Sequence, residues 1–147
     1  MNEFMKIAID EARKGMFSGD GGPFGSVIVK DGVVVGKGHN EVINRNDPTC
    51  HGEMMAIRDA CRRLGTFDLS SCELYTTAQP CPMCRGAILW ANISKVYYGC
   101  TTDDVDKIGF RDKVFYEEQG NASEEIDRDQ CRKLFDEYLR IENRQNY

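Results

Sequence analysis

A strand, a short helix and a second strand follow one another in the middle of the chain, and this succession is the strongest constraint on the fold. Residues 73–77 (ELYTT) and 95–99 (KVYYG) have the composition of strands. Between them, the segment 81–92 (CPMCRGAILWAN) follows Pro80, and Pro82 suits the first position of a helix. A parallel pair of strands needs such a crossover, and its sheet must be covered by helices. We therefore expect an α/β protein.

The N-terminal part of the chain predicts a helix and a hairpin. Apolar residues at three- and four-residue spacing over residues 4–16 indicate an amphipathic helix. Asp-Gly between two runs of β-branched residues, within 27–35, predicts a tight hairpin, which Gly36, Gly38 and Asn40 are expected to end. The polar residues 41–49 are then expected to form a loop.

Two more amphipathic helices are expected further along. Residues 51–64 have helical spacing, and Gly65 stands where a helix terminator belongs. Apolar residues within 131–141 indicate a final helix. The segment 100–122 has no convincing pattern, so we expect a sheet of four strands or with a poorly patterned fifth. Nothing in the sequence resembles a linker, and residues 1–147 are expected to form a single domain.

Composition and charge exclude several classes of function. The chain carries 24 acidic against 19 basic residues and a net charge of −5, whereas proteins that bind an extended nucleic acid cluster Lys and Arg. It has no apolar run near the roughly 20 residues that span a bilayer, and its N-terminus lacks a signal-peptide core. Seven cysteines would leave one unpaired in an oxidising compartment. We therefore expect a cytoplasmic protein that binds neither a membrane nor an extended nucleic acid.

Cys81 and Cys84 form a C-x-x-C motif at the start of a predicted helix. The motif is compatible with a redox dithiol, with half of a four-cysteine zinc site, or with half of a catalytic metal site. A four-cysteine site needs a second closely spaced pair, which the other cysteines do not form, and a catalytic site needs a third ligand. Cys50 either lines a pocket or packs. The remaining cysteines are expected to be small buried hydrophobic residues: Cys61, Cys72, Cys100 and Cys131.

His51 is the candidate third ligand, because it opens the helix expected over 51–64. Taken alone, it could be an ordinary residue at a helix start, with Glu53 a charge near the positive end of the helix dipole. Helix N-termini also favour the thiolate forms of Cys81 and Cys84 that bind metal. Two thiolates and one imidazole would leave the fourth tetrahedral position of a zinc ion to water or hydroxide. Glu53 would then be free to shuttle protons as the catalytic acid–base.

Together, His51-x-Glu53 and the Pro-Cys-x-x-Cys motif at 80–84 match the H-x-E…P-C-x-x-C signature of zinc deaminases. On these residues the chain resembles the cytidine-deaminase-like superfamily, most clearly over residues 21–99, and within it the bacterial guanine deaminases. The resemblance implies a three-layer α/β/α domain whose mixed sheet of four to five strands is covered by helices. It also implies one zinc ion per chain and the hydrolytic deamination of a small nucleobase.

The same resemblance assigns residues that contact the substrate. Phe24 of the GGPFG motif would stack on the base, Asn40 would hydrogen-bond its ring, and Asp112 of the GFRD motif would accept N–H bonds from a purine. The chain ends on Tyr147, and in guanine deaminases such a tail, here about 124–147, closes the active site of the neighbouring subunit in a swapped dimer. We therefore expect a homodimer. Without the family resemblance, Phe24 would be interpreted as a core aromatic residue and Asn40 as a turn residue. Asp112 would be a solvated carboxylate and Tyr147 part of a frayed chain end.

The preferred substrate is the open question. Gly52 stands where guanine and tRNA adenosine deaminases usually carry alanine, and Gln79 replaces their glutamate; both are expected at the floor of the substrate pocket. We expect conversion of guanine to xanthine and ammonia. The alternatives are a cytosine, nucleoside or other aminated-heterocycle deaminase, a tRNA adenosine deaminase and a non-catalytic zinc module. Residues 124–147 carry seven acids and five bases, a poor track for phosphates, and Glu53 argues against a non-catalytic module.

Overall fold

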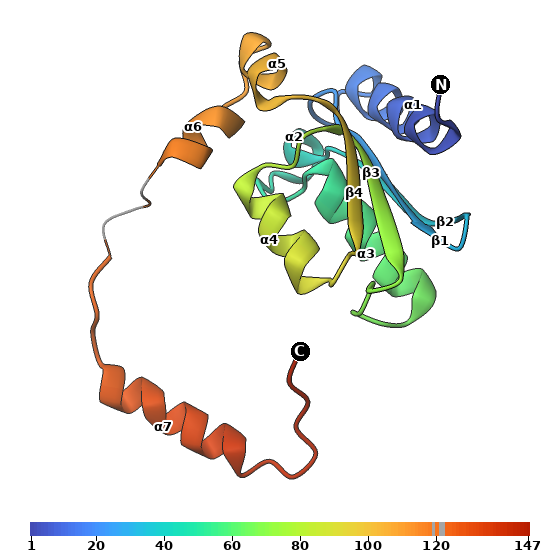
Figure 1. The fold of residues 1–147 in the computed structure, drawn as a ribbon. Helices are drawn as coiled ribbons and strands as arrows, with labels where there is room; N and C mark the ends of the chain where they lie inside the picture. Colours follow the sequence, from blue (N-terminus) through green and yellow to red (C-terminus); the bar gives the residue numbers. More distant parts are fainter. Residues whose placement is uncertain (119, 121–122) are drawn as a thin grey trace. The chain divides into compact units, whose positions relative to one another are not determined.

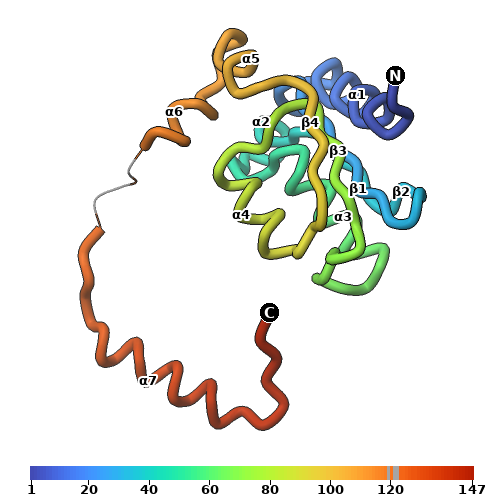
Figure 2. The backbone as a smooth tube through the Cα atoms, viewed as in Figure 1, coloured from blue at the N-terminus to red at the C-terminus, as the bar shows by residue number. Residues whose placement is uncertain are grey.

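The structure, a computed structural model, describes residues 1–118, 120 and 123–147. These residues fall into two compact units, Met1–Glu117 and Glu118–Tyr147, and Figure 2 traces the backbone of both. The first unit contains the sheet and the predicted metal ligands. The expected organisation as a single domain with residues 124–147 as a capping tail stays a prediction.

A four-stranded mixed sheet forms the centre of the first unit (Figure 1). In spatial order its strands are β2 (Val33–His39), β1 (Gly25–Lys30), β3 (Cys72–Ala78) and β4 (Lys95–Cys100). β1 pairs antiparallel with β2 and with β3, whereas β3 and β4 pair in parallel, which confirms the expected strand–helix–strand unit. No fifth strand occurs among the described residues of the segment 100–122; residues 119, 121 and 122 lie outside them.

The hairpin of β1 and β2 turns at residues 31–32, whose φ angles of 49° and 77° are both positive. This geometry suits a two-residue hairpin turn, because its twist matches that of the strands. Asn40 follows the last residue of β2, as predicted, but the prediction is wrong for Gly36 and Gly38, since β2 continues through both to His39. The two glycines instead let the helix α3 (Gly52–Leu64) approach the strand β2 closely. A Cβ on either would lie only 2.6–2.7 Å from atoms of that helix.

Helices cover both faces of the sheet (Figure 1). α1 (Glu3–Phe17) packs on one face, and α3 (Gly52–Leu64) and α4 (Pro82–Trp90) pack on the other. The predicted limits of two helices are confirmed: Gly65 ends α3 with a φ of 65°, and Pro82 occupies the first turn of α4. The three layers confirm the predicted α/β/α class with its mixed sheet.

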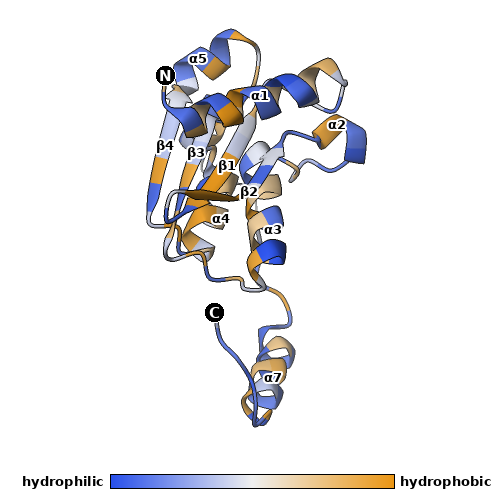
Figure 3. Cartoon of the chain, turned by 90° about the vertical axis from the view of Figure 1, so that its right-hand side faces the viewer, coloured by the Kyte–Doolittle hydropathy of each residue, from blue (hydrophilic) through white to orange (hydrophobic). Residues whose placement is uncertain are grey.

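Each interface between layers has its own apolar core, because alternate residues of a strand point to opposite faces of the sheet. Val27 and Val29 of β1 face α1, whereas Ile28 faces α3 and α4. Figure 3 shows the apolar residues of the central strands in orange between the helices. The second of these cores also contains Ala56, Ala60, Leu69, Cys72, Leu74, Ile88 and Ala91. This packing holds α3 and α4 firmly against the sheet.

Three short helices differ from the prediction. α2 (Val42–Arg45) lies in the segment expected to be a polar loop, and α5 (Thr102–Lys107) and α6 (Asp112–Glu117) lie in the segment expected to be irregular. With four to six residues, each is too short for apolar periodicity to reveal it. A capping signal exists for α5, because the side chains of Thr101 and Asp104 bond each other's backbone across its first turn.

All seven cysteines are free thiols. Cys72 is buried, as predicted, and Cys61 is half-buried. The prediction of burial is wrong for Cys100 and Cys131, which are exposed. Cys100 ends β4, which is an edge strand, so one side of that strand has no neighbour among the described strands. Cys131 lies on the helix Arg128–Leu139 of the second unit, which has no buried residues of its own.

The second unit contains α7 (Arg128–Leu139), in place of the helix expected over 131–141. Beyond α7 the chain folds back locally. The Tyr138 hydroxyl lies 2.9 Å from Asn146 Oδ1 and 3.2 Å from the Gln145 carbonyl oxygen, and Arg144 donates to the Leu139 carbonyl at 3.0 Å. In the part of the chain that the structure describes, no helix has the length and apolar character that a membrane span requires.

Candidate active site

The N-termini of α3 and α4 bring the three expected zinc ligands together. His51 directly precedes α3 and Cys81 directly precedes α4, both in extended backbone conformation. Cys84 follows in the first turn of α4. His51 Nδ1 lies 3.4 Å from Cys81 Sγ and 3.5 Å from Cys84 Sγ, and all three ligand atoms lie within 4.8 Å of one another. Two short motifs that are distant in the sequence therefore converge on one point.

The separation of these atoms fits a zinc ion. Zinc binds nitrogen at about 2.0–2.1 Å and sulfur at about 2.3 Å, so a tetrahedral site places the two atoms about 3.6 Å apart. Two sulfurs and one nitrogen leave one position open, as in catalytic zinc sites. Asp20, His39 and Glu41 also cluster. The two ring nitrogens of His39, however, already face Glu11 and Asp20, at 3.1 and 2.8 Å, so His39 is held as a structural residue at the end of β2.

The charges of the cluster favour a bound cation. A hydrogen bond from the Cys84 thiol lowers the pKa of Cys81 to about 4, and the same bond raises the pKa of Cys84. The hydrogen bond with Cys81 also raises the pKa of His51. Cys84 therefore keeps its proton and donates it to the Cys81 thiolate. A divalent cation would displace this proton and bind both sulfurs as thiolates.

Glu53 lies in the first turn of α3, and its side chain is buried. Burial raises the pKa of Glu53. The Ser26 hydroxyl of β1 lies 3.4 Å from Glu53 Oε1 and 2.9 Å from Thr76 Oγ1 of β3. Ser26 has a single hydroxyl proton. When Ser26 donates this proton to the Glu53 carboxylate, its oxygen accepts a hydrogen bond from the Thr76 hydroxyl. Hydroxyls of two neighbouring strands therefore orient Glu53, a support that no local pattern in the sequence indicates.

A cavity of about 770 Å³ lies beside the cluster, a size that suits a small-molecule ligand. Most of its lining is apolar, and all of it belongs to the unit Met1–Glu117. The lining comes from the loop after α1, the segment between β2 and α3, the start of α4 and the start of α6. Of the predicted site residues, six line it: Phe24, Asn40, His51, Glu53, Cys81 and Asp112.

Asn40 follows β2 directly and is buried. Its Oδ1 accepts a hydrogen bond from the Val42 backbone N–H at 3.0 Å, and its own backbone N–H donates to the Phe24 carbonyl at 2.9 Å. Gly21 leaves room for the amide, because a Cβ there would lie 2.1 Å from Asn40 Oδ1. Since the oxygen already has a partner, the side chain can offer a ligand the N–H donors of its amide.

Phe24 and Phe110 form an aromatic pair in the lining of the cavity. Their ring centroids are 4.9 Å apart, and the rings meet edge to face at 82°. Gly22 makes this possible, since a Cβ at that position would lie 2.7 Å from each ring. The pair supplies an apolar wall on which a flat heterocycle can stack. Phe110 was not singled out from the sequence, although it lies in the GFRD motif that identified Asp112.

Asp112 begins α6 and is half-buried at the cavity. Burial, and then the nearby Cys81 thiolate, raise the pKa of its carboxyl. One turn later, the Tyr116 hydroxyl donates to the Pro80 carbonyl, directly before Cys81. This bond ties α6, and with it Asp112, to the zinc-ligand cluster. Tyr116 was missed in the sequence because α6 itself was not expected.

The structure does not bring every predicted residue to the cavity. Gly52 is buried against β1, where a Cβ would lie 3.2 Å from the Phe24 carbonyl oxygen and 3.3 Å from Ser26 Oγ. It therefore sets the spacing of α3 and β1 and is not part of the lining. Gln79 does line the cavity, and its Oε1 accepts a hydrogen bond from the backbone at the start of α5 at 3.3 Å. Tyr147 belongs to the second unit, and its role stays a prediction.

Known proteins share this arrangement. Residues 1–100 match the family model of the cytidine and deoxycytidylate deaminase zinc-binding region. Guanine deaminase of Bacillus subtilis (strain 168) is 48% identical over 122 residues, which cover 83% of this chain and 78% of the relative. A tRNA-specific adenosine deaminase of Aquifex aeolicus (strain VF5) is 46% identical over 95 residues, 65% of this chain and 62% of the relative. The crystal structure of a Bacillus subtilis guanine deaminase matches with a TM-score of 0.93 and 40% identity, over 100% of this chain and 99% of that one.

The fold, the ligand cluster and these relatives together define a zinc-dependent hydrolase that removes an amino group by breaking a C–N bond. The chain belongs to the cytidine and deoxycytidylate deaminase family, whose zinc-binding region it contains. Its similarity extends to guanine deaminases and to tRNA adenosine deaminases.

Proposed function

We propose that the chain deaminates a free nucleobase and that this base is guanine, which is converted to xanthine and ammonia. One observation carries the proposal. In a single cavity, buried Glu53 lies beside the zinc-ligand cluster, together with a hydrogen-bond donor, Asn40, and an acceptor, Asp112. A purine base presents both ring acceptors and N–H donors, so it can use both side chains at once.

In this mechanism His51, Cys81 and Cys84 hold the zinc ion. Zinc, when bound, lowers the pKa of a water molecule from about 15.7 toward 7 and so supplies a nucleophile at neutral pH. Glu53 takes a proton from the attacking water and passes it to the ring nitrogen beside the amino-bearing carbon. It then takes the second proton of the former water from the hydroxyl now bonded to that carbon and gives it to the amino group. The C–N bond breaks, a C=O bond forms, and the amino group leaves as ammonia. The hydroxyl of Ser26 keeps the carboxylate oriented for both transfers.

The remaining residues of the cavity orient the base. The Asn40 amide donates to a ring acceptor, and the Asp112 carboxylate accepts from ring N–H groups. Phe24 and Phe110 limit the base to one plane and exclude water from the reacting carbon. Correct orientation in a dry site is a large part of the rate enhancement that enzymes achieve.

The extent of similarity favours guanine over an adenosine in tRNA. The guanine deaminase relative is 48% identical over 122 residues, whereas the tRNA deaminase relatives that are matched over 121–140 residues are 34–36% identical. The structural match to a guanine deaminase includes residues 118–147. A tRNA substrate would also need many phosphate contacts, whereas the cavity lining is mostly apolar and residues 124–147 are acidic on balance. The close tRNA deaminase relative nevertheless makes tRNA adenosine the second candidate.

Ammonia release from a panel of substrates tests the proposal. The panel contains guanine, cytosine, adenine, their nucleosides and a tRNA anticodon stem-loop. We expect guanine to have the highest kcat/KM. Equal or better activity on cytosine or on the stem-loop would overturn the choice of guanine, and stoichiometric zinc with no activity on any member would support a non-catalytic zinc module.

Glu53→Gln tests the role of the carboxylate. The variant keeps the shape of the site, so we expect unchanged zinc content by metal analysis and a loss of at least a hundredfold in kcat. Glu3→Gln, an exposed acid in the first turn of α1, is the matched control and should behave as the wild type. Retained ammonia release in Glu53→Gln would refute the mechanism.

We also propose that the protein is a cytoplasmic homodimer in which residues 124–147 close an active site. The free state of all seven cysteines supports a reducing compartment, and zinc binding by Cys81 and Cys84 requires it. The separate unit formed by residues 118–147 supports a capping tail. A monomer by light scattering at the concentration of the activity assay would refute the dimer.

A further inference from the structure

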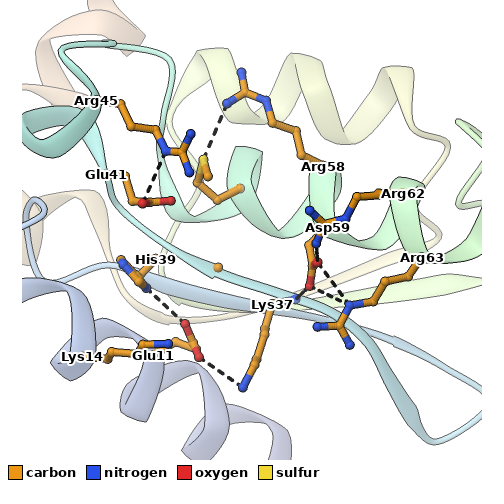
Figure 4. A pocket seen from close by; sticks show the side chains of 12 residues that line it. Glu11, Lys14, Lys37, His39, Glu41, Arg45, Arg58, Asp59, Arg62 and Arg63 are labelled. Atoms are coloured by element: carbon orange, nitrogen blue, oxygen red, sulfur yellow. Dashed lines mark hydrogen bonds and ion pairs between the residues drawn. The ribbon is translucent and has the colours of Figure 1, made fainter.

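A second cavity, of about 420 Å³, lies at the outer edge of β2 between α1 and α3, and Figure 4 shows its side chains. We refer to it as the β2-edge groove. None of its lining residues lines the substrate cavity. Its side chains come from α1, β2, the segment that follows β2 and the exposed side of α3. The deamination mechanism gives this groove no role.

The β2-edge groove is basic although the whole chain is acidic. Six of its residues are cations, and three are carboxylic acids, whereas the net charge of the chain is −5. The cations are Lys14, Lys37, Arg45, Arg58, Arg62 and Arg63. A concave site with a surplus of one sign of charge concentrates ligands of the opposite sign.

The three acids hold cations in place around the groove. Asp59 accepts from Arg62 at 2.6 Å and from Arg63 at 3.1 Å, and it also accepts the backbone N–H of Lys37 at 3.0 Å. An ion pair at 3.3 Å joins Glu41 to Arg45, and another at 3.3 Å joins Glu11 to Lys37. The cations are thus oriented in advance, and the groove keeps a surplus of positive charge.

Among the residues that the structure describes, the side chain of Arg58 contacts uncharged groups and not a carboxylate. Its guanidinium contacts Cys50 Sγ at 3.4 Å, Met55 Sδ at 3.5 Å and Thr49 Oγ1 at 3.4 Å. Sulfur is a weak acceptor, and none of these contacts involves a charge. In the described part of the chain, no ion pair with an acid includes Arg58 or Lys14. An anion in the groove would provide much stronger partners for the Arg58 donors.

We propose that the β2-edge groove binds a small oligophosphate, such as the phosphate chain of a nucleotide. Guanidinium groups bind phosphate oxygens in bidentate fashion, and four of the six cations are arginines. The volume of the groove matches a ligand of nucleotide size. Carboxylates among the cations disfavour the extended backbone of an RNA, which would pass Glu11, Glu41 and Asp59.

Calorimetric titration of the zinc-loaded full chain with inorganic triphosphate and with UTP, whose base is not the proposed substrate, tests the proposal. We expect one site per chain, with a Kd below about 1 mM at 0.1 M salt that weakens as salt rises. UTP that binds tighter than triphosphate would identify a nucleotide, and equal binding would identify the phosphate chain itself as the ligand. No binding of either would overturn the proposal, as would binding of a single-stranded RNA oligomer alone.

Variants of the groove place the site. Arg58→Gln combined with Arg62→Gln should weaken binding at least tenfold, and Lys14→Gln, which breaks no ion pair, should weaken it severalfold without a change in Tm. Arg13→Gln is the matched control, because Arg13 pairs with Asp10 and does not line the groove. Wild-type affinity in the double variant, or an equal loss in Arg13→Gln, would refute the assignment.

Discussion

Gly38→Ala tests whether the close approach of α3 to β2 holds the active site together. A Cβ at Gly38 would lie 2.6 Å from Met55 Cβ and 2.7 Å from the backbone nitrogen of Ala56. Ordinary van der Waals contacts start at 3.4 Å, so α3 must move away from β2 by about 0.7 Å. A change of side-chain rotamer cannot relieve the contact with Ala56, because the contacting atom belongs to the backbone. Overpacking of this kind costs about 1–3 kcal/mol. Because the same helix begins with His51 and Glu53, we also expect kcat to fall by about tenfold.

The assay is thermal and denaturant unfolding of the zinc-loaded protein, with kcat measured on the same samples. For a chain of this size, 1–3 kcal/mol corresponds to a Tm lower by about 2–12 °C. Gly86→Ala is the matched control, because no atom lies within 4 Å of the added Cβ inside α4. That variant should gain about 0.5–1 kcal/mol, as alanine does over glycine in a helix. Wild-type stability and activity in Gly38→Ala would refute the reasoning.

Three further predictions concern pH, positioning and the tail. Burial raises the pKa of Glu11, but hydrogen bonds from His39 and Lys37 outweigh it, so the pKa lies below 4.5. The ionised carboxylate therefore stabilises the fold above pH 4.5, and Glu11→Gln should lower the free energy of unfolding by about 1.5 kcal/mol at pH 7. Unfolding curves should show that this difference from the wild type shrinks as pH falls below 4.5. A difference that is the same at every pH would contradict the prediction. Tyr116→Phe loosens α6 and should raise KM about fivefold with kcat within twofold, whereas unchanged kinetics would show that the hydroxyl has no such role. Deletion of residues 145–147 should lower kcat/KM more than tenfold with Tm within 2 °C, and an unchanged rate would remove the tail from the site.

The zinc-ligand cluster was predictable because each half of it is local. Cys81 and Cys84 share one face at the start of a helix, and His51 and Glu53 stand at the start of another. Proline and glycine mark the limits of these helices in the sequence itself. Only the distance between the two halves needed the structure, and it is 3.4–3.5 Å between the ligand atoms.

The wall of the cavity was predictable only in part. Asn40 and Asp112 were found through the resemblance to a family, whereas Phe110 and Tyr116 were not. The partner of each missed residue is distant in the chain, and the helix that carries Tyr116 is too short for a periodic pattern. Hydrogen bonds and ring contacts between distant segments leave no local signal.

The amino-acid sequence by itself determined the order along the chain of the strands and of the four longer helices, the parallel crossover and the residue types that bind zinc. These features depend on periodicity, capping and motif spacing, which act over a few residues. The tertiary structure alone decided that Gly36 and Gly38 lie within a strand, that Gly52 spaces a helix from the sheet, and that six cations surround one groove. Such outcomes depend on which surfaces meet when the layers pack. The residues that meet at these surfaces are far apart in the chain, so no single stretch of sequence shows that they will be in contact.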